Sequence, residues 1–231
     1  MFSERLAHSC ENCIVAWKNF KNLSKAEIKL IDENRYEATF KAGEIILKQG
    51  SPSTSAVFLA SGIAKIYIEG LDGKNFILGI ALPTNLILGP GVHVSHRNSY
   101  SVSALTVVQA CFINFEIINQ LIQQNPAFAR GMLEDLSSKS QVVHNKLVSL
   151  TQKKMPGRIA EALIFLSDVV FRADEFDLIL SRQELGEMTN MAKESVVRIL
   201  KELEGTGVIK SGYSHVKILD KEKLRLISER G

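Results

Sequence analysis

The apolar positions between residues 180 and 203 follow a helical period that is interrupted once. Leu185 and Met188 form the apolar pair of a first short helix, which we expect to begin at Arg182. After a break at 189–191, the period resumes in a second helix with one apolar stripe, made of Val196, Ile199, Leu200 and Leu203. Two short helices joined by a tight turn predict a helix-turn-helix.

Local signals mark the ends of both helices. Ser181 stands three residues before Glu184, the spacing of a capping box at a helix start. Asn190 lies in the break, and asparagine tolerates a positive φ better than most residues. Gly186 lacks a Cβ, so we expect the second helix to cross closely there. Gly207, with Gly205, is expected to end the second helix.

A β-hairpin is predicted directly after these helices. Two short apolar runs, 208–210 and 215–219, flank the turn-rich stretch 211–214. A hairpin in this position is typical of a winged helix-turn-helix. The last segment, 220–230, is expected to form a helix that caps the same domain.

The polar face of the second helix is the candidate DNA-reading surface. The second helix of a helix-turn-helix enters the major groove, where arginine can bind guanine and glutamate can accept from cytosine. We expect Arg198 and Glu194 to set base identity, and Lys193 to contact an outer base or a phosphate. The alternative is a surface helix whose charges are merely solvated. The full set of expected DNA-binding residues is Arg182, Lys193, Glu194, Ser195, Val197, Arg198 and Lys201.

Residues 23–115 have a different period, with short apolar runs separated by glycines. Residues 64–69 alternate, which places Ala64, Ile66 and Ile68 on one face of a strand. Asp72 and Gly73 predict a hairpin turn before a partner strand at 76–81, and 101–112 supplies at least one more strand. Many short strands with regular turns predict a β-sandwich or barrel.

A long helix is expected after residue 125, because Asn125 and Pro126 form a good helix start. Its apolar positions nearly follow a heptad repeat. A long helix with one apolar edge, or seam, is expected to pack against a partner helix. The expected dimerisation residues are Met132, Leu136, Val143, Leu147 and Leu150. The alternative is that this helix packs against the β-barrel of its own chain, with Phe128, Leu133 and Val142 also in the contact. The stretch 153–157, which contains Pro156, is expected to end the helix and act as a hinge.

Composition narrows the class of protein. A chain of 231 residues has room for two modest domains, and its net charge of +3 means that any DNA contact depends on local placement of charge. No apolar run approaches the length of a membrane span, and no secretory signal is evident. The odd number of cysteines, three, argues against a disulfide framework. We therefore expect a cytoplasmic protein without a membrane partner.

Three sequence motifs between residues 182 and 209 resemble the DNA-binding end of the Crp/Fnr family of bacterial transcription regulators. They are Arg-Gln-Glu-Leu-Gly at 182–186, Lys-Glu-Ser-Val-x-Arg-Ile-Leu at 193–200 and Leu-Glu-x-x-Gly-x-Ile at 203–209. The resemblance implies that Lys193, Glu194 and Arg198 occupy base-reading positions. Ala192 departs from the family, in which many members carry a Ser or Thr that caps the recognition helix.

The resemblance also implies the architecture, an α+β fold with a β-barrel of the cyclic-nucleotide-binding type (a double-stranded β-helix or jelly roll). The expected parts are a Cys-containing segment at 1–22, the barrel sensor domain at 23–124, a dimerisation helix with its hinge at 125–155, and a winged helix-turn-helix domain at 156–231. The implied partners are a second copy of the chain, double-stranded DNA with a near-palindromic site, and RNA polymerase. We do not expect an enzyme. A jelly-roll metalloenzyme would need a fuller set of His and Glu ligands.

The effector is not expected to be cyclic AMP. Nucleotide-binding members carry a Gly-Glu-Leu turn and an Arg-Ser pair, whereas this chain has Gly-Pro-Gly from Gly89 and Asn98-Ser99. The positive charge that a buried phosphate needs is therefore missing, although Arg97 is adjacent. We assign Gly89, Arg97, Asn98 and Ser99 to an effector pocket and leave its ligand unknown.

Three cysteines are candidate ligands of an iron–sulfur cluster. Cys10 and Cys13 have a spacing that can grip a metal ion or a cluster, and some family members add a distant cysteine, matched here by Cys111. A further N-terminal cysteine of those members is replaced by Asn19, so the set is incomplete. The cysteines are therefore either unligated thiols or ligands of a cluster. His93 and His96 lie in one loop and could bind haem. A redox or nitric-oxide sensor with a cluster or haem therefore stays an alternative function.

Overall fold

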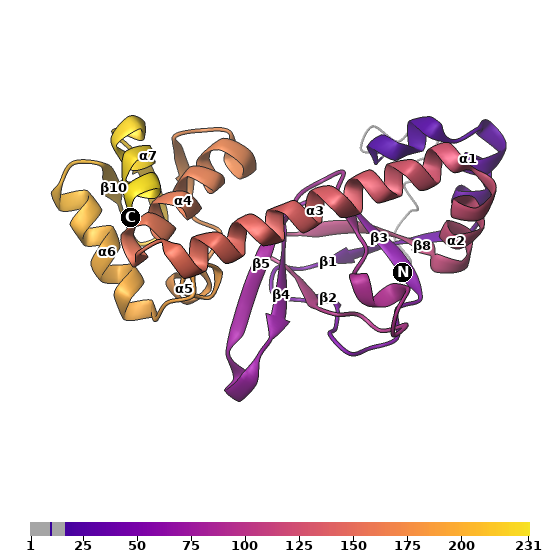
Figure 1. Ribbon diagram of the computed structural model, residues 1–231, viewed down its shortest axis with the longest axis horizontal. Coiled ribbons are helices and arrows are strands. Elements are labelled where there is room, and N and C mark those ends of the chain that lie inside the picture. The colour runs from indigo at the N-terminus through magenta and orange to yellow at the C-terminus, as the bar shows by residue number, and fades with distance from the viewer. Residues whose placement is uncertain (1–9, 11–16) are drawn as a thin grey trace, which may run out of the picture. The chain divides into compact units, whose positions relative to one another are not determined.

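The structure, a computed structural model, describes Cys10 and residues 17–231 (Figure 1). Its contacts divide the chain into two compact units. The first contains the described part of 1–64 together with 81–139, and the second contains 65–80 together with 140–231. None of the described helices combines the length and the apolar character that crossing a bilayer requires.

Two four-stranded sheets form the β-rich part of the chain. The first has the strand order β1-β8-β3-β6, and β8 pairs antiparallel with both β1 and β3. Its strands are β1 Arg35–Phe40, β3 Ser55–Ser61, β6 Leu86–Ile87 and β8 Val108–Asn114. The second sheet has the order β2-β7-β4-β5, with β2 Ile45–Leu47, β4 Ala64–Glu69, β5 Asn75–Ala81 and β7 Ser101–Ala104. The expected β-rich domain is therefore confirmed.

Burial along β4 does not follow the strict alternation of the sequence, although Ala64 is fully buried. Ile68 is 36% exposed, whereas Tyr67 is only 7% exposed. Lys65 Nζ lies 5.1 Å from the centre of the Tyr67 ring and also binds Glu184 Oε1 at 2.7 Å. Tyr67 is thus buried although it lies on the face that alternation marks as polar, and Lys65 of that face pairs with α5 (Arg182–Thr189) of the same unit.

Aromatic side chains lie at the centre of the core of the first unit. The rings of Trp17, Phe20, Phe58 and Phe128 lie 5.3–6.1 Å apart in contacting pairs. Asn19 is buried beside them, and its Nδ2 donates to the carbonyl oxygen of Phe128 at 2.8 Å. The helical elements around this core are a 3₁₀ turn at Lys18–Asn22, α1 at Lys25–Glu33 and α2 at Phe115–Gln124.

The long helix α3, Pro126–Gln152, begins where the sequence predicts (Figure 1). Asn125 caps it, since its Oδ1 accepts the backbone N–H of Phe128 at 3.0 Å. Leu136 and Leu147 of the predicted seam are each 54% exposed. In the alternative set, Phe128 is fully buried, whereas Leu133 and Val142 are 65% and 60% exposed. The seam thus leaves apolar surface available to a partner helix.

Besides the end of α3 and most of strands β4 and β5, the second unit holds a small sheet and helices α4 to α7. Its sheet has the order β10-β11-β9, formed by β9 Glu175–Asp177, β10 Ile209–Ser211 and β11 His215–Ile218. The helices are α4 Met155–Phe165, α5 Arg182–Thr189, α6 Lys193–Gly205 and α7 Lys221–Arg230. The hairpin β10–β11 is the predicted wing, whereas the sequence did not indicate β9. Pro156 lies in the first turn of α4, so the chain break between α3 and α4 comes earlier, at 153–154.

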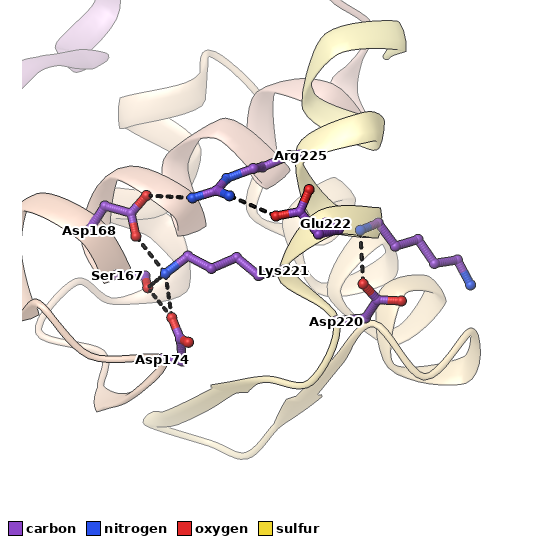
Figure 2. Close-up of polar contacts among 8 residues, drawn as sticks. Ser167, Asp168, Asp174, Asp220, Lys221, Glu222 and Arg225 are labelled. Carbon is purple, nitrogen blue, oxygen red and sulfur yellow. Dashed lines mark hydrogen bonds and ion pairs between the residues drawn. The ribbon is translucent and has the colours of Figure 1, made fainter.

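Ion pairs tie α7 to a π-helical turn, Leu166–Phe171, that continues α4 (Figure 2). Lys221 Nζ binds the carboxylates of Asp168, at 2.5 Å, and Asp174. Arg225 Nη2 lies 3.6 Å from Asp168 Oδ2. The Lys221 ammonium holds the pKa of the Asp174 carboxyl below its usual range. These contacts connect α7 to the turn that continues α4, and α4 also contacts α5 and α6.

Candidate nucleic-acid interface

The start of α5 has the predicted capping box. Glu184 N–H donates to Ser181 Oγ at 3.1 Å, and Ser181 N–H donates to Glu184 Oε2 at 2.8 Å. Two backbone donors of the first turn are thereby satisfied. Leu185 and Met188 are buried, as their spacing indicates.

The turn between α5 and α6 depends on Asn190 and Gly186. Asn190 has a φ of 52°, as expected for a tight turn. A Cβ on Gly186 would lie 2.5 Å from the carbonyl oxygen of Met191, and Met191 N–H donates to Gly186 O at 3.0 Å. The closest approach at Gly186 is therefore made by the turn backbone, and Val196 of the crossing helix also comes within 3.6 Å of such a Cβ.

Helix α6 buries its apolar stripe and exposes the opposite side. Val196, Ile199, Leu200 and Leu203 are buried, as predicted. Ser195 and Val197 are half-buried. The exposed side is a continuous surface lined by Lys193, Glu194, Val197, Arg198, Lys201 and Glu202. The structure thus brings most of the predicted DNA-binding residues together on one face.

Arg198 is available for a base contact. Its side chain is 56% exposed, and Nη1 donates to Glu202 Oε1 at 2.7 Å. An exposed pair of this spacing contributes only about 0.3–0.5 kcal/mol, so a guanine edge can replace Glu202 at little cost. The guanidinium can then donate two hydrogen bonds to guanine O6 and N7.

Arg182 is placed differently from the other predicted residues. Its Nη2 donates to Gly212 O at 2.7 Å and to Ser211 Oγ at 3.2 Å, so it connects α5 to the wing. Burial lowers the pKa of this guanidinium. Its contribution to DNA binding stays a prediction, and its observed contacts support the position of the wing.

The wing places an exposed residue beside the predicted DNA-binding residues, and the sequence analysis did not include it among them. Tyr213 is fully exposed at the tip of the hairpin. It lines a groove of about 660 Å³ together with Lys193, Lys201 and Arg182. The sequence feature that could have indicated this residue is an aromatic side chain in a turn of small polar residues, where no core exists to bury it.

Helix α6 lacks a side-chain cap. Ala192 has cap geometry, with φ −67° and ψ 149°, and makes no capping hydrogen bond. We expect Ala192→Ser to raise the free energy of unfolding by about 0.5–2 kcal/mol, because the hydroxyl can accept a free N–H of the first turn. Urea denaturation of both proteins measures this difference. An unchanged or lower stability would contradict the prediction.

The residues assigned to the effector pocket lie between β6 and β7 in the first unit, and two of them bond to the loop between β2 and β3. Arg97 Nη1 donates to Gly50 O at 2.6 Å, and Asn98 Nδ2 donates to Ser51 Oγ at 3.0 Å. Ser99 Oγ accepts the N–H of Gly91 at 2.8 Å. Gly89, the remaining residue, packs near Tyr100. The Arg97 guanidinium, the positive charge of this set, thus has a backbone carbonyl as its partner.

Cys10 and Cys111 share one environment in the first unit. Arg35 Nη1 donates to Cys111 Sγ at 3.7 Å, and the backbone N–H of Cys10 donates to Asp32 Oδ1 at 3.3 Å. Burial raises the pKa of the Cys10 thiol to about 12.

Cys13 lies outside the described residues. Within the described part of the chain, no group of three or more His, Cys, Asp or Glu side chains is arranged to hold a metal ion. Asn19, at the position of the missing cysteine, has a structural partner in Phe128. The described donors do not make a complete cluster site, and the iron–sulfur prediction rests on a residue outside them.

Comparison with known proteins agrees with both parts of this description. A sequence profile of the Crp-like helix-turn-helix domain matches residues 157–227, and one of the cyclic nucleotide-binding domain matches residues 37–125. The transcriptional activator protein anr of Pseudomonas aeruginosa is 30% identical over 190 residues, which cover 80% of this chain and 77% of the relative. The cAMP-activated global transcriptional regulator CRP of Salmonella typhimurium is 28% identical over 169 residues, which cover 71% and 80%.

Solved structures share the fold. A transcriptional regulator of the Crp/Fnr family from Eubacterium rectale has a TM-score of 0.78 at 19% identity, covering 92% of this chain and 98% of that one. FixK2 from Bradyrhizobium japonicum has a TM-score of 0.75 at 18% identity, covering 84% and 96%. The matched relatives are transcription regulators and not enzymes. With an exposed reading helix and these matches along its length, the chain belongs to the Crp/Fnr family of DNA-binding transcription regulators.

Proposed function

We propose that the protein acts as a homodimer that reads a specific, near-palindromic DNA sequence. The observation that carries the proposal is the exposed face of α6, on which Lys193, Glu194 and Arg198 stand together while the apolar stripe is buried. The exposed leucines of α3 supply a seam for a second copy. A dimer presents two reading helices, which suits two half-sites related by symmetry.

The proposed division of the chain follows the same plan. Residues 23–124 sense an effector other than cyclic AMP, 125–155 pair the protomers and transmit the signal, and 156–231 bind DNA. An effector controls such a switch only if it prefers one arrangement of these parts. RNA polymerase is the further partner that we expect at a promoter.

Selection of bound sequences from random DNA tests this proposal. The expected product is a near-palindrome whose half-site centres are about one helical turn, roughly 10 base pairs, apart. Binding should weaken as salt rises, because lysine and arginine displace counterions from the phosphates. Recovery of a single asymmetric half-site would contradict a homodimer, and no enrichment at all would contradict base reading.

A further inference from the structure

A cavity of about 240 Å³ lies within the second unit, away from the DNA-reading face. Strand β5 contributes Leu78 to its wall, and α3 contributes Val142. Phe165 of α4 and Met188 of α5 complete an apolar side. All of these residues belong to 65–80 or 140–231, so the cavity is formed inside one compact unit.

Two cations line the same cavity. Lys146 Nζ donates to the carbonyl oxygen of Ile77 at 3.0 Å and lies 5.3 Å from the centre of the Phe76 ring. Arg158 Nη1 donates to the carbonyl oxygen of Asn190 at 3.2 Å. Arg158 Nε is buried and has no hydrogen-bond partner among the described residues. A buried donor without a partner is uncommon and indicates a place where an acceptor is favoured.

The charge of these cations is not balanced by an ion pair. Glu161 is the carboxylate of the lining, and its Oε1 binds Lys153 Nζ at 3.0 Å while its Oε2 accepts from Ser149 Oγ. Within the described residues, Lys146 and Arg158 form no ion pair. Burial lowers the pKa of the Lys146 ammonium to about 8, an effect that the charge of Glu161 only partly opposes. A buried cation in this state gains most from a nearby anion.

We propose that this cavity binds a small organic monocarboxylate. The carboxylate would accept from Arg158 Nε and from Lys146 Nζ, and the hydrocarbon or aromatic body would lie against Leu78, Val142, Phe165 and Met188. The volume equals that of about eight water molecules, which suits a metabolite of roughly ten non-hydrogen atoms. An inorganic anion would leave the apolar wall unfilled, and a neutral molecule would leave the charge uncompensated.

The position of the cavity links this ligand to regulation, a step that rests on the proposed function. Its walls come from α3, α4 and the last turn of α5, and α5 is the first helix of the helix-turn-helix. A ligand that bridges Lys146 of α3 and Arg158 of α4 favours one arrangement of these helices. The equilibrium between arrangements, and with it DNA affinity, then shifts toward the bound form.

Calorimetric titration of the full-length protein without DNA tests the binding site. Phenylacetate is the probe, and phenylacetamide is its neutral counterpart of nearly the same shape. We expect phenylacetate to bind at least about tenfold more tightly than phenylacetamide, because only the acid makes charge-assisted hydrogen bonds. Lys146→Met should weaken phenylacetate binding by about tenfold or more, because it removes the ammonium and keeps the bulk.

Lys139→Met is the matched control. Lys139 also lies on α3, and its Nζ donates to the carbonyl oxygen of Leu86 at 2.8 Å, but it does not line the cavity. This variant should bind phenylacetate as the unaltered protein does. If Lys146→Met is poorly folded by circular dichroism, Arg158→Lys serves instead, since it keeps the charge, loses the Nε donor and should also weaken binding.

Three results would overturn the proposal. They are equal binding of the acid and the amide, equal loss in the Lys146 and Lys139 variants, and no heat with either phenylacetate or hexanoate. A second measurement, DNA affinity with and without phenylacetate, tests only the regulatory step. Binding without an effect on DNA affinity would keep the site and reject its regulatory role.

Discussion

Replacing Arg198 with alanine is expected to cost about 1–3 kcal/mol of binding free energy for each half-site of the preferred DNA sequence. Random DNA should lose much less, because it is held mainly through phosphate contacts. The structural reason is the exposed guanidinium, whose partner in the free protein is the exposed carboxylate of Glu202. Fluorescence anisotropy with the selected site and with a scrambled duplex, at one salt concentration, measures both losses.

Arg130→Ala is the matched control for this experiment. Arg130 pairs with Glu134 four residues later on α3, at 3.2 Å, and both side chains are exposed. The change therefore removes the same charge and the same kind of helix pair without touching α6. It should leave the preference for the selected site unchanged. If Arg198→Ala weakens both duplexes equally, Arg198 contacts phosphate and does not read a base.

The second large effect is expected from charges introduced into the apolar seam of α3. The double variant Leu136→Lys, Leu147→Lys should be monomeric and should lose high-affinity DNA binding. Each leucine that is buried between two helices contributes about 1.5–3 kcal/mol, and a lysine there adds an uncompensated charge. Sedimentation equilibrium gives the mass, and anisotropy gives the DNA affinity.

The same two charges on the polar side of α3 provide the control. Ser138 and Gln141 are exposed and lie off the seam, so Ser138→Lys, Gln141→Lys should stay dimeric. Both double variants should keep the helical circular dichroism signal, since Leu136 and Leu147 are more than half exposed in the single chain. A dimer that survives the seam substitutions would show that the protomers pair elsewhere.

Features that depend on neighbouring residues along the chain could be predicted from sequence. The capping box at Ser181, the positive φ at Asn190 and the buried stripe of α6 all follow from local spacing and local backbone preference. The start of α3 at Asn125 follows in the same way. These signals lie within one or two helical turns, so the residues themselves determine them.

Features that depend on distant segments were decided by the tertiary structure. Alternation could not show that Lys65 pairs with Glu184, or that Tyr67 is buried while Ile68 is partly exposed. The same holds for β9, which becomes a strand by pairing with β11, and for Arg182, which is held by the wing.

The sequence by itself therefore determined helices α3, α5 and α6, the caps of α3 and α5, the buried side of α6 and the family. The cavity between β5 and three helices, the partners of buried charges and the burial of Tyr67 on β4 arise only when segments far apart in the chain pack together. The pattern of apolar residues in a sequence indicates which side of a helix or strand is apolar. Which other element packs against that side depends on long-range contacts.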